Sequence, residues 1–323
     1  MFALPPVRRL IAVAAALLVA VGTLTACGSS EAEVVLRVGD QTGETESRLR
    51  AAGLLNDLPY EIEWARFPAA ANLHEALRAD AVDIGSAADS PTVAAIAGGS
   101  QIKAVAAWNN GGKGTYVLVP EDSPIRTLAD LKGKRISPST RGSVAHYLVL
   151  GALQQAGLSE SDATLNFLSP TDASSAFSTG SIDAWATWGV YAARTRGELG
   201  ARVLTDGAGI NSGLSVLSAT DKSLTDPAKR EAIADFADRV DRSYTWAQLN
   251  PAAFDEWYAE FARQPLDIAA QIRPEQTAYR RIPLDDAFAA QLQNTFNTWT
   301  RAGVLQGHEN LHDHVDPTVG APR

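Results

Sequence analysis

Short apolar or β-branched runs alternate with helix-forming segments along most of the chain. Because parallel strands need a long crossover, usually a helix, this alternation predicts an α/β fold with parallel strand pairs. Strands are predicted at 34–39, 60–64, 82–85, 102–107, 116–120, 135–137 and 165–168, with helices at 42–55, 70–79, 90–98, 128–131, 143–156 and 172–179. From about Asp226 the pattern changes to long amphipathic helices, predicted at 226–249, 251–263, 265–272 and 284–302.

Two segments of the chain repeat one another. The sequence LRADAVDIG at 77–85 is echoed by FSTGSIDAW at 177–185. In both, a helix ends and a short strand brings a loop to the edge of a sheet. A chain of 323 residues exceeds what one compact core usually serves, so we expect two lobes on the same plan, each aiming such a loop at a shared cleft. Ligands of open α/β sheets bind beyond the carboxyl ends of the strands.

The charge of the chain limits its partners. The formal net charge is -9 and the pI is near 5.1, and no run rich in Lys or Arg follows the first few residues. Nucleic acid is therefore not an expected partner, because phosphate binding needs a basic face. The sequence also lacks a Gly-rich phosphate loop, a His-Glu metal motif and a nucleophile elbow, so we expect neither a cofactor nor an enzyme.

The histidines near the C-terminus leave one alternative open. His308, His312 and His314 lie close to Glu309 and Asp313, and such a group could bind a metal. However, His312 and His314 are two residues apart and would not share a helix face. We interpret the stretch from Gly307 onward as a polar surface or frayed tail, and expect no metal site.

The N-terminus has the pattern of an export signal. Arg8 and Arg9 precede the uncharged apolar run Leu10–Val21, which is too short for a comfortable membrane span. Leu24-Thr25-Ala26-Cys27 then resembles the bacterial lipobox, which implies cleavage after residue 26 and lipid attached to Cys27, followed by a tether over 27–33. The alternative is an ordinary signal with an incidental cysteine. Cys27 is the single cysteine of the chain, so no internal disulfide can form.

Several motifs, in order and spacing, are similar to one family of binding proteins. They are Glu63-Trp64 with Phe67, the segment 77–85, Ser123-Pro124-Ile125 with LADLKGKRI at 128–136, RGSVAHYL at 141–148, and Asp183-Ala184-Trp185 with Trp188. Together they resemble the aliphatic sulfonate, taurine and nitrate class of periplasmic-type binding proteins. The likeness runs from about Val34 to Ala193 and is weaker towards the end.

The resemblance implies a two-lobe periplasmic-binding-protein fold of type II, with a mainly parallel sheet flanked by helices in each lobe. Lobe 1 would comprise 34–115 plus 220–316 and lobe 2 would comprise 116–219, with hinge strands near Thr115 and 211–218 and a tail over 317–323. It also implies a monomer that works with ABC permease and ATPase subunits as their extracytoplasmic solute-binding component. The lipid on Cys27 would hold this protein at the outer face of the cell membrane.

Helix N-termini supply the chemistry for a small anion, because their unpaired N–H groups carry about half a positive charge. Three predicted helix starts face the cleft: after Gln41, at Ser90-Pro91-Thr92, and at Gly142-Ser143. The resemblance implies sulfonate contacts from Gln41, Ser90, Gly142 and Ser143, with Trp185 and Trp188 near the organic tail. Further candidates for ligand contact are Asp89, Trp108, Asn109, Arg141 and His146.

Each candidate also fits a structural role. Asp89 and Ser90 are good helix caps, Gln41 could cap a helix, and His146 could pack inside one. Asp40 and Asp89 depart from the family pattern, since two carboxylates beside an anion site would repel the ligand unless one of them meets an amine. A taurine-like zwitterion is therefore a second hypothesis for the ligand.

Other functions remain open on the same fold. The ligand could be nitrate, bicarbonate or a thiamin-precursor pyrimidine, which would stack on the tryptophans. A desulfinase-like enzyme is a distant alternative, because such relatives use a cysteine nucleophile and Cys27 lies in the lipobox.

Overall fold

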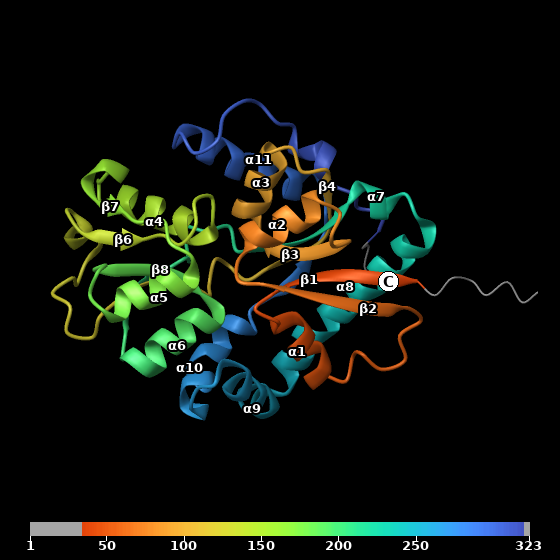
Figure 1. Cartoon of the computed structure of the whole chain (residues 1–323), viewed down its shortest axis with the longest axis horizontal. Coiled ribbons are helices and arrows are strands. Elements are labelled where there is room, and N and C mark those ends of the chain that lie inside the picture. Colours follow the sequence, from red (N-terminus) through yellow and green to blue (C-terminus); the bar gives the residue numbers. More distant parts are fainter. Residues whose placement is uncertain (1–33, 320–323) are drawn as a thin grey trace, which may run out of the picture. The chain divides into compact units, whose positions relative to one another are not determined.

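Two β-sheets, each with helices on both faces, form the framework of residues 34–319, the part that the computed structural model describes (Figure 1). The predicted signal segment and Cys27 lie outside the described residues. The six-stranded sheet, called sheet A, has the order β11-β4-β10-β3-β1-β2, and the five-stranded sheet B has the order β7-β6-β8-β5-β9. The strands are β1 Val35–Gln41, β2 Glu61–Phe67, β3 Ile84–Ala88, β4 Ile102–Asn109, β5 Thr115–Val119, β6 Arg135–Ser137, β7 Thr164–Leu165, β8 Ala184–Trp188, β9 Arg202–Asp206, β10 Leu214–Thr220 and β11 Arg280–Ile282.

Most strands of each sheet run in one direction. In sheet A, β1 to β4 share a direction and β10 and β11 oppose it. In the described strands of sheet B, β5 alone opposes the others. The α/β class and the mainly parallel sheets predicted from the sequence are confirmed.

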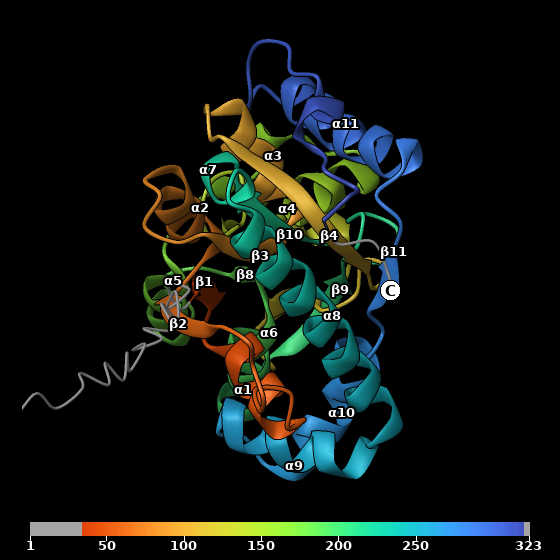
Figure 2. The ribbon, with the colours of Figure 1, turned by 90° about the vertical axis from the view of Figure 1, so that its right-hand side faces the viewer.

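Helices cover both faces of each sheet (Figure 1, Figure 2). The apolar residues of α1 and α8 pack on one face of sheet A, and those of α2, α3 and α11 pack on the other. On sheet B, α4 covers one face and α5 and α6 cover the other, while α9 and α10 pack against α6 and α8. The helices are α1 Glu44–Ala51, α2 Ala70–Arg78, α3 Asp89–Ala97, α4 Val144–Gln155, α5 Pro170–Ser178, α6 Gly189–Leu199, α7 Asp221–Leu224, α8 Pro227–Leu249, α9 Pro251–Ala262, α10 Leu266–Gln276 and α11 Asp286–Arg301, with short 3₁₀ turns at η1 Leu128–Leu131, η2 Glu160–Asp162 and η3 Leu311–His314. Within 34–319 no helix combines the length and apolar character needed to cross a membrane.

The chain crosses between the sheets twice, at 110–114 and at 207–213. The crossings lie against each other: the Asn110 amide donates to the Gly213 carbonyl over 3.0 Å. A Cβ on Gly112 would lie 2.5 Å from the Gly207 carbonyl oxygen, and Gly112 has a left-handed backbone conformation with a φ of +83°. Only glycine meets both demands without strain, which explains why this crossing is so rich in that residue.

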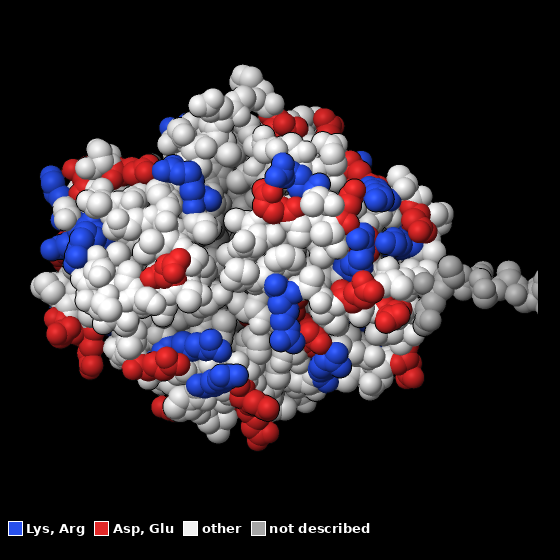
Figure 3. Space-filling model, in the orientation of Figure 1, with Lys and Arg blue, Asp and Glu red and all other residues white. Residues whose placement is uncertain are grey.

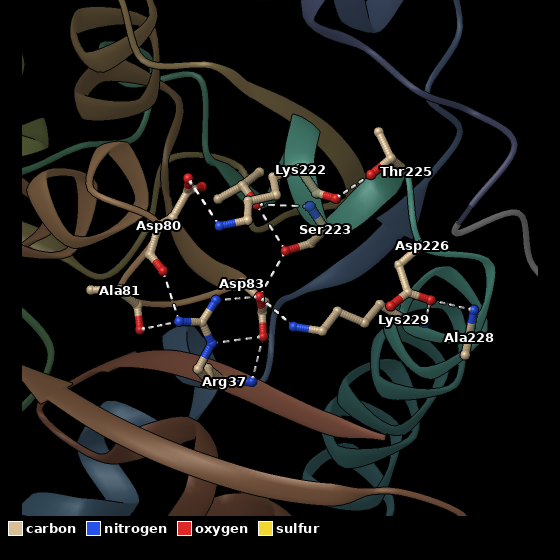
Figure 4. Close-up of polar contacts among 11 residues, drawn as sticks. Arg37, Asp80, Ala81, Asp83, Lys222, Ser223, Thr225, Asp226, Ala228 and Lys229 are labelled. Carbon is tan, nitrogen blue, oxygen red and sulfur yellow. Dashed lines mark hydrogen bonds and ion pairs between the residues drawn. The ribbon is translucent and has the colours of Figure 1, made fainter. Parts of the chain in front are cut away.

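A buried carboxylate ties sheet A to the helices around it (Figure 4). Asp83 accepts a hydrogen bond from the Arg37 backbone amide at 2.9 Å and pairs with the Arg37 guanidinium at 2.7 Å. Lys229 of α8 and Ser223 of α7 reach the same carboxylate at 2.9 and 2.8 Å. Although burial opposes it, the hydrogen bonds from Arg37 and Lys229 hold the pKa of Asp83 well below its usual range.

The C-terminal stretch corrects one prediction. Leu311 is buried in the core that faces α11, and the His314 ring lies 3.0 Å from the Ile102 carbonyl oxygen. Val315 forms a β-bridge with Ala104. Residues 311–316 are therefore packed onto the fold beside β4, which their polar and weakly periodic sequence did not reveal, whereas Gly307 and His308 are exposed as predicted.

Candidate functional site

A cavity of about 600 Å³ is lined by residues of both sheets and by the first turns of five helices. In sheet A these helices are α1, α2 and α3, which follow β1, β2 and β3; in sheet B they are α4, which follows β6, and α6, which follows β8. The cavity thus lies beyond the carboxyl ends of parallel strands, where the sequence analysis placed the ligand site. A volume of this size suits a small organic ligand.

The start of α4 is organised by its own loop. Ser143 caps the helix: its Oγ accepts a hydrogen bond from the His146 amide at 3.1 Å and donates to the Pro138 carbonyl at 3.0 Å. The Gly142 amide donates to His146 Nδ1 at 3.2 Å. The hydroxyl of Ser143 and the amide of Gly142 are therefore occupied, and the first-turn amides of Val144 and Ala145 are the ones without an intrahelical partner.

The two walls of the cavity differ in charge. Neither α4 nor α6 has an acidic residue in its first turn. On the opposite wall, Asp40 accepts hydrogen bonds from the Thr45 and Glu46 amides of α1 at 3.2 and 2.9 Å. Asp89 lies in the first turn of α3, where its Oδ2 accepts a hydrogen bond from Thr295 at 2.7 Å. Burial raises the pKa of both carboxyls. The N-termini of α1 and α3 thus meet internal carboxylates. The first turns of α2 and α4 have no acidic residue, and a Cβ at the start of α6 would lie 3.7 Å from Glu44 Oε2.

These contacts correct the predicted helix caps. The residue before α3 is Ala88, and no side chain caps that helix. Asp89 and Ser90 lie inside the first turn because the helix begins one residue earlier than the capping pattern suggests. Asp89 instead binds α11 through Thr295. Asp40, which the sequence did not mark as a cap, accepts hydrogen bonds from first-turn amides of α1.

One end of the cavity carries charged and aromatic groups that the sequence analysis did not identify. Glu44 Oε1 lies 3.3 Å from Arg48 Nη1. The Arg48 guanidinium lies 4.1 Å from the centre of the Tyr244 ring, which stacks on Tyr279 with 4.7 Å between ring centroids. The spacing of Glu44 and Arg48 by four residues was the available signal, but the two tyrosines come from distant segments with no local pattern to mark them.

Two buried polar side chains at the cavity wall were also missed. His74 Nδ1 has no hydrogen-bond partner among residues 34–319, and burial lowers the pKa of this imidazole to about 4, so it is neutral at pH 7. Both side-chain polar atoms of Asn211 likewise have no partner within the described part of the chain. Buried polar groups are normally paired, so both residues are candidates for ligand contact.

Six of the eleven candidate ligand-binding residues line the cavity: Gln41, Asp89, Arg141, Gly142, Ser143 and Trp188. The Gln41 side chain is held by a hydrogen bond from its Nε2 to the Ser86 carbonyl at 2.7 Å. The exposed Arg141 guanidinium lies over the Phe167 ring, 4.3 Å from its centre. Their contact with a ligand remains a prediction.

Trp185 and Trp108 are corrections, because neither lines the cavity. Trp185 is fully buried against Phe177 of α5. It lies three residues before Trp188 on β8, and residues an odd number apart point to opposite faces of a strand. Trp108 is buried in sheet A, where its Nε1 donates to Asp241 at 3.0 Å.

Ser90, His146 and Asn109 also lie outside the cavity lining. The buried Ser90 accepts a hydrogen bond at its carbonyl from Trp299 Nε1 at 3.3 Å. His146 packs against Trp299 with 4.9 Å between ring centroids, and burial lowers its pKa to about 4. Asn109 donates to the Ser212 carbonyl at 2.9 Å. These side chains hold the elements behind the cavity, and His146 orders the loop before α4 through Gly142.

The described residues contain no cluster of three or more His, Cys, Asp or Glu side chains arranged to hold a metal ion. His314 instead lies 3.2 Å from Glu309. On the face shown in Figure 3, Lys and Arg side chains are interspersed with Asp and Glu side chains, and uncharged residues cover most of the surface. The charge of the cavity walls is therefore more informative about a ligand than the charge of this outer face.

Comparisons with known proteins agree with this geometry. A family model described as NMT1/THI5 like matches residues 65–254. A protein of Escherichia coli (strain K12) named as an aliphatic sulfonates-binding protein is 38% identical over 207 residues, which cover 63% of this chain and 64% of that protein. A protein of the same name from Bacillus subtilis (strain 168) is 31% identical over 147 residues, 46% of this chain and 44% of that protein. The matches thus span less than two thirds of each relative's length.

Solved structures match a larger share of this chain. The alkanesulfonate-binding protein from Xanthomonas axonopodis pv. citri bound to MOPS has a TM-score of 0.80 and 28% identity, covering 88% of this chain and 99% of its own. The periplasmic aliphatic sulphonate binding protein from Escherichia coli has a TM-score of 0.74 and 28% identity, covering 90% and 94%. The desulfurization enzyme DSZB, at 17% identity and a TM-score of 0.58 over 88% of this chain, shares the fold alone.

Proposed function

Because the chain belongs to the NMT1/THI5-like family and has the periplasmic-binding-protein fold, we propose that it is the extracytoplasmic solute-binding component of an ABC importer. It captures an aliphatic sulfonate in the cavity between the two sheets. The names of the relatives support this proposal, since both sequence relatives and both closely similar structures are named for sulfonate binding.

The observation that carries the proposal is the unequal charge of the cavity walls. The first turns of α4 and α6 carry no acidic residue, whereas α1 and α3 of sheet A start beside the buried carboxylates of Asp40 and Asp89. A sulfonate presents three acceptor oxygens and one negative charge, which suits unpaired first-turn amides. The anionic head therefore lies at the sheet B wall, at the start of α4.

The size and lining of the cavity support an organic tail. Trp188, Tyr244 and Tyr279 line it, and its volume of about 600 Å³ exceeds what a bare oxyanion such as nitrate needs. The rings offer apolar surface to an alkyl chain. A thiamin-precursor pyrimidine could also stack on them, but it would leave the start of α4 without an anion.

Ligand capture requires contacts on both walls, because a ligand closes two lobes only by binding the closed arrangement more tightly. We place the lobe boundaries at the two crossings, 110–114 and 207–213. The second boundary moves from the predicted residue 219 because β10 pairs with β3 and β4 of sheet A.

The proposal includes export and anchoring. The signal segment 1–26 is removed, and lipid on Cys27 holds the monomer at the outer face of the membrane beside the permease and ATPase subunits. Labelled palmitate should enter the wild-type protein and not a Cys27→Ala variant. Incorporation into the variant would refute the anchor at Cys27.

The protein is not an enzyme under this proposal. Residues 34–319 contain no cysteine, so they offer no thiol nucleophile for desulfinase-like chemistry. The sequence relatives are named as binding proteins.

Isothermal titration of the purified full-length protein tests the function. The panel comprises linear alkanesulfonates, nitrate, and 4-amino-5-hydroxymethyl-2-methylpyrimidine. We expect one-to-one binding of the alkanesulfonates. The affinity should rise as the alkyl chain lengthens, because burying each added methylene contributes about 0.8 kcal/mol to the free energy of binding. Binding of nitrate or the pyrimidine, with no heat from any sulfonate, would refute the proposal.

A further inference from the structure

A hydrogen bond joins the two walls of the cavity. Tyr191, in the first turn of α6, donates its hydroxyl hydrogen to the Pro68 carbonyl at 2.9 Å, and Tyr191 also lines the cavity. Pro68 lies between β2 and α2 of sheet A, whereas α6 follows β8 of sheet B. The bond therefore connects segments that are 123 residues apart in the sequence and belong to different sheets.

The acceptor of this bond is held in place by its neighbours. The Phe67 carbonyl accepts a hydrogen bond from the Thr42 amide at 2.9 Å, which ties the end of β2 to the segment after β1. The proline ring restricts the backbone at Pro68 itself. Ala69 is the N-cap residue of α2, so the Pro68 carbonyl precedes the acceptors that the helix uses for its own hydrogen bonds. This carbonyl is therefore available to a donor from the other wall.

The donor is held by ring packing. The Tyr191 ring meets the Trp188 ring edge-on with 6.1 Å between centroids, and it packs against the core between sheet B and helices α5 and α6. Burial raises the pKa of Tyr191, so its hydroxyl keeps its proton at neutral pH. A Cβ on Gly189 would lie 3.7 Å from Glu44 Oε2, which places the first turn of α6 close to α1 of the opposite wall.

The bond lies far from the two crossings of the chain. β4 ends at the first crossing and β10 begins after the second. In sheet A, β2 is an edge strand, and β3 and β1 separate it from β10. With about 4.8 Å between neighbouring strands, the end of β2 lies about 14 Å from β10 across the sheet. A rotation of the lobes about the crossings therefore separates Pro68 from Tyr191 more than it separates groups beside the crossings.

Other contacts between helices of different sheets are of another kind. Tyr147 of α4 packs against Trp299 of α11 with 5.2 Å between ring centroids. Arg194 of α6 donates to the Ala262 carbonyl at 3.0 Å, where α6, α9 and α10 share a buried apolar core. Apolar packing has no preferred direction and tolerates small sliding motions, whereas a single hydrogen bond weakens steeply when its geometry is lost. The bond between Tyr191 and Pro68 is therefore more sensitive to opening than the packed contacts.

We propose that the Tyr191 hydroxyl and the Pro68 carbonyl form a latch that stabilises the closed arrangement of the lobes and sets how long a bound ligand is retained. This inference rests on the proposed function and adds the control of ligand release to it. The latch exists only in the closed arrangement, so it slows dissociation without changing association. Because the hydroxyl hydrogen is donated to Pro68, the effect does not depend on which ligand is bound. Tyr191 is thus a positioning residue that acts through the lobe arrangement.

Stopped-flow fluorescence of the full-length protein with propane-1-sulfonate and hexane-1-sulfonate tests the latch, because it measures the association and dissociation rate constants separately. Tyr191→Phe keeps the ring and removes the hydroxyl. It should raise the dissociation rate constant about two- to fivefold, the effect of losing one hydrogen bond between neutral groups. The factor should be the same for both ligands, and the association rate constant should stay within about twofold of the wild-type value.

Tyr147→Phe is the matched control, because Tyr147 also lies where helices of the two sheets meet but its hydroxyl has no hydrogen-bond partner within 34–319. It should leave both rate constants unchanged, and thermal unfolding of both variants verifies that they fold. An unchanged dissociation rate in Tyr191→Phe would refute the latch alone. A rise for only one of the ligands would also refute it, since the hydroxyl would then contact that ligand directly. If the wild type binds no sulfonate, the proposed function fails and the latch fails with it.

Discussion

Asp83 and Asp183 make the same set of bonds in the two sheets. Asp83 accepts the Arg37 amide at 2.9 Å and Asp183 accepts the Arg135 amide at 2.8 Å, and each carboxylate pairs with the guanidinium of the same arginine at 2.7 Å. Each aspartate directly precedes a strand, β3 or β8, that leads to the cavity. The repeat seen in the sequence therefore corresponds to one construction used twice, and the two copies differ mainly in burial.

Replacing Asp83 and Asp183 in turn by asparagine separates the effect of burial on stability from the effect of hydrogen-bond geometry, because the two aspartates share the geometry and differ in burial. The Asp83 side chain is 1% exposed and also binds Lys229, whereas Asp183 is 30% exposed. Asp83→Asn should reduce the free energy of unfolding by about 3 kcal/mol, because it removes a buried charge that pairs with two half-buried cations, Arg37 and Lys229. Asp183→Asn should cost far less, since solvent screens that pair. Urea unfolding measures both, and equal losses would contradict this account.

Asp83 should also make the stability of the protein depend on pH. Its pKa is lower in the folded than in the unfolded protein, so its contribution to stability is present above the unfolded value, near 4, and is lost as the pH falls below it. Asp83→Asn should therefore flatten the decline of stability between about pH 5 and pH 3. The measurement is urea unfolding across that range, and an unchanged decline in the variant would count against the assignment.

The crossings between the sheets depend on close glycine packing. Gly111 and Gly112 both have positive φ angles, but a Cβ on Gly111 would meet no atom within 4 Å, whereas one on Gly112 would lie 2.5 Å from the Gly207 carbonyl. Gly111→Ala should cost about 1 kcal/mol for its backbone conformation. Gly112→Ala should cost about 1–3 kcal/mol more for the clash. If thermal unfolding shows the same loss for both, the crossings are not in contact.

Trp188 should report ligand binding by fluorescence. Of the seven tryptophans in the sequence, Trp188 lines the cavity and Trp185 is buried three residues away. An alkanesulfonate should change the intrinsic fluorescence of the wild type and of Trp185→Phe, and Trp188→Phe should lose most of that change. A full signal in Trp188→Phe would place the ligand elsewhere.

Hydrophobic patterning accounts for the parts of the structure that the sequence predicted. The strands at β1, β4, β5 and β6 are apolar runs bounded by turns. Parallel pairing places the carboxyl ends of β1, β3, β6 and β8, and so the starts of the helices that follow them, at one cavity. The echo of 77–85 by 177–185 located β3 and β8 in equivalent positions. The periodicity of apolar residues is a local property of the sequence, so the strands and helix starts that depend on it could be predicted.

The direction of individual side chains was harder to predict. Ser143 was expected to hold the ligand, but its hydroxyl caps α4, and Trp185 was expected in the cleft but points into the core. Tyr244 and Tyr279 reach the cavity from α8 and the turn before β11, which lie far along the chain. Tertiary packing decides these positions, and no local pattern encodes it.

A crystal structure of the protein grown with a linear alkanesulfonate tests the central claim most directly. We predict sulfonate oxygens within hydrogen-bonding distance of the Val144 and Ala145 amides, with the alkyl chain directed towards Trp188. A sulfonate bound at the start of α1 in place of the Asp40 carboxylate, or bound outside the cavity, would contradict the account.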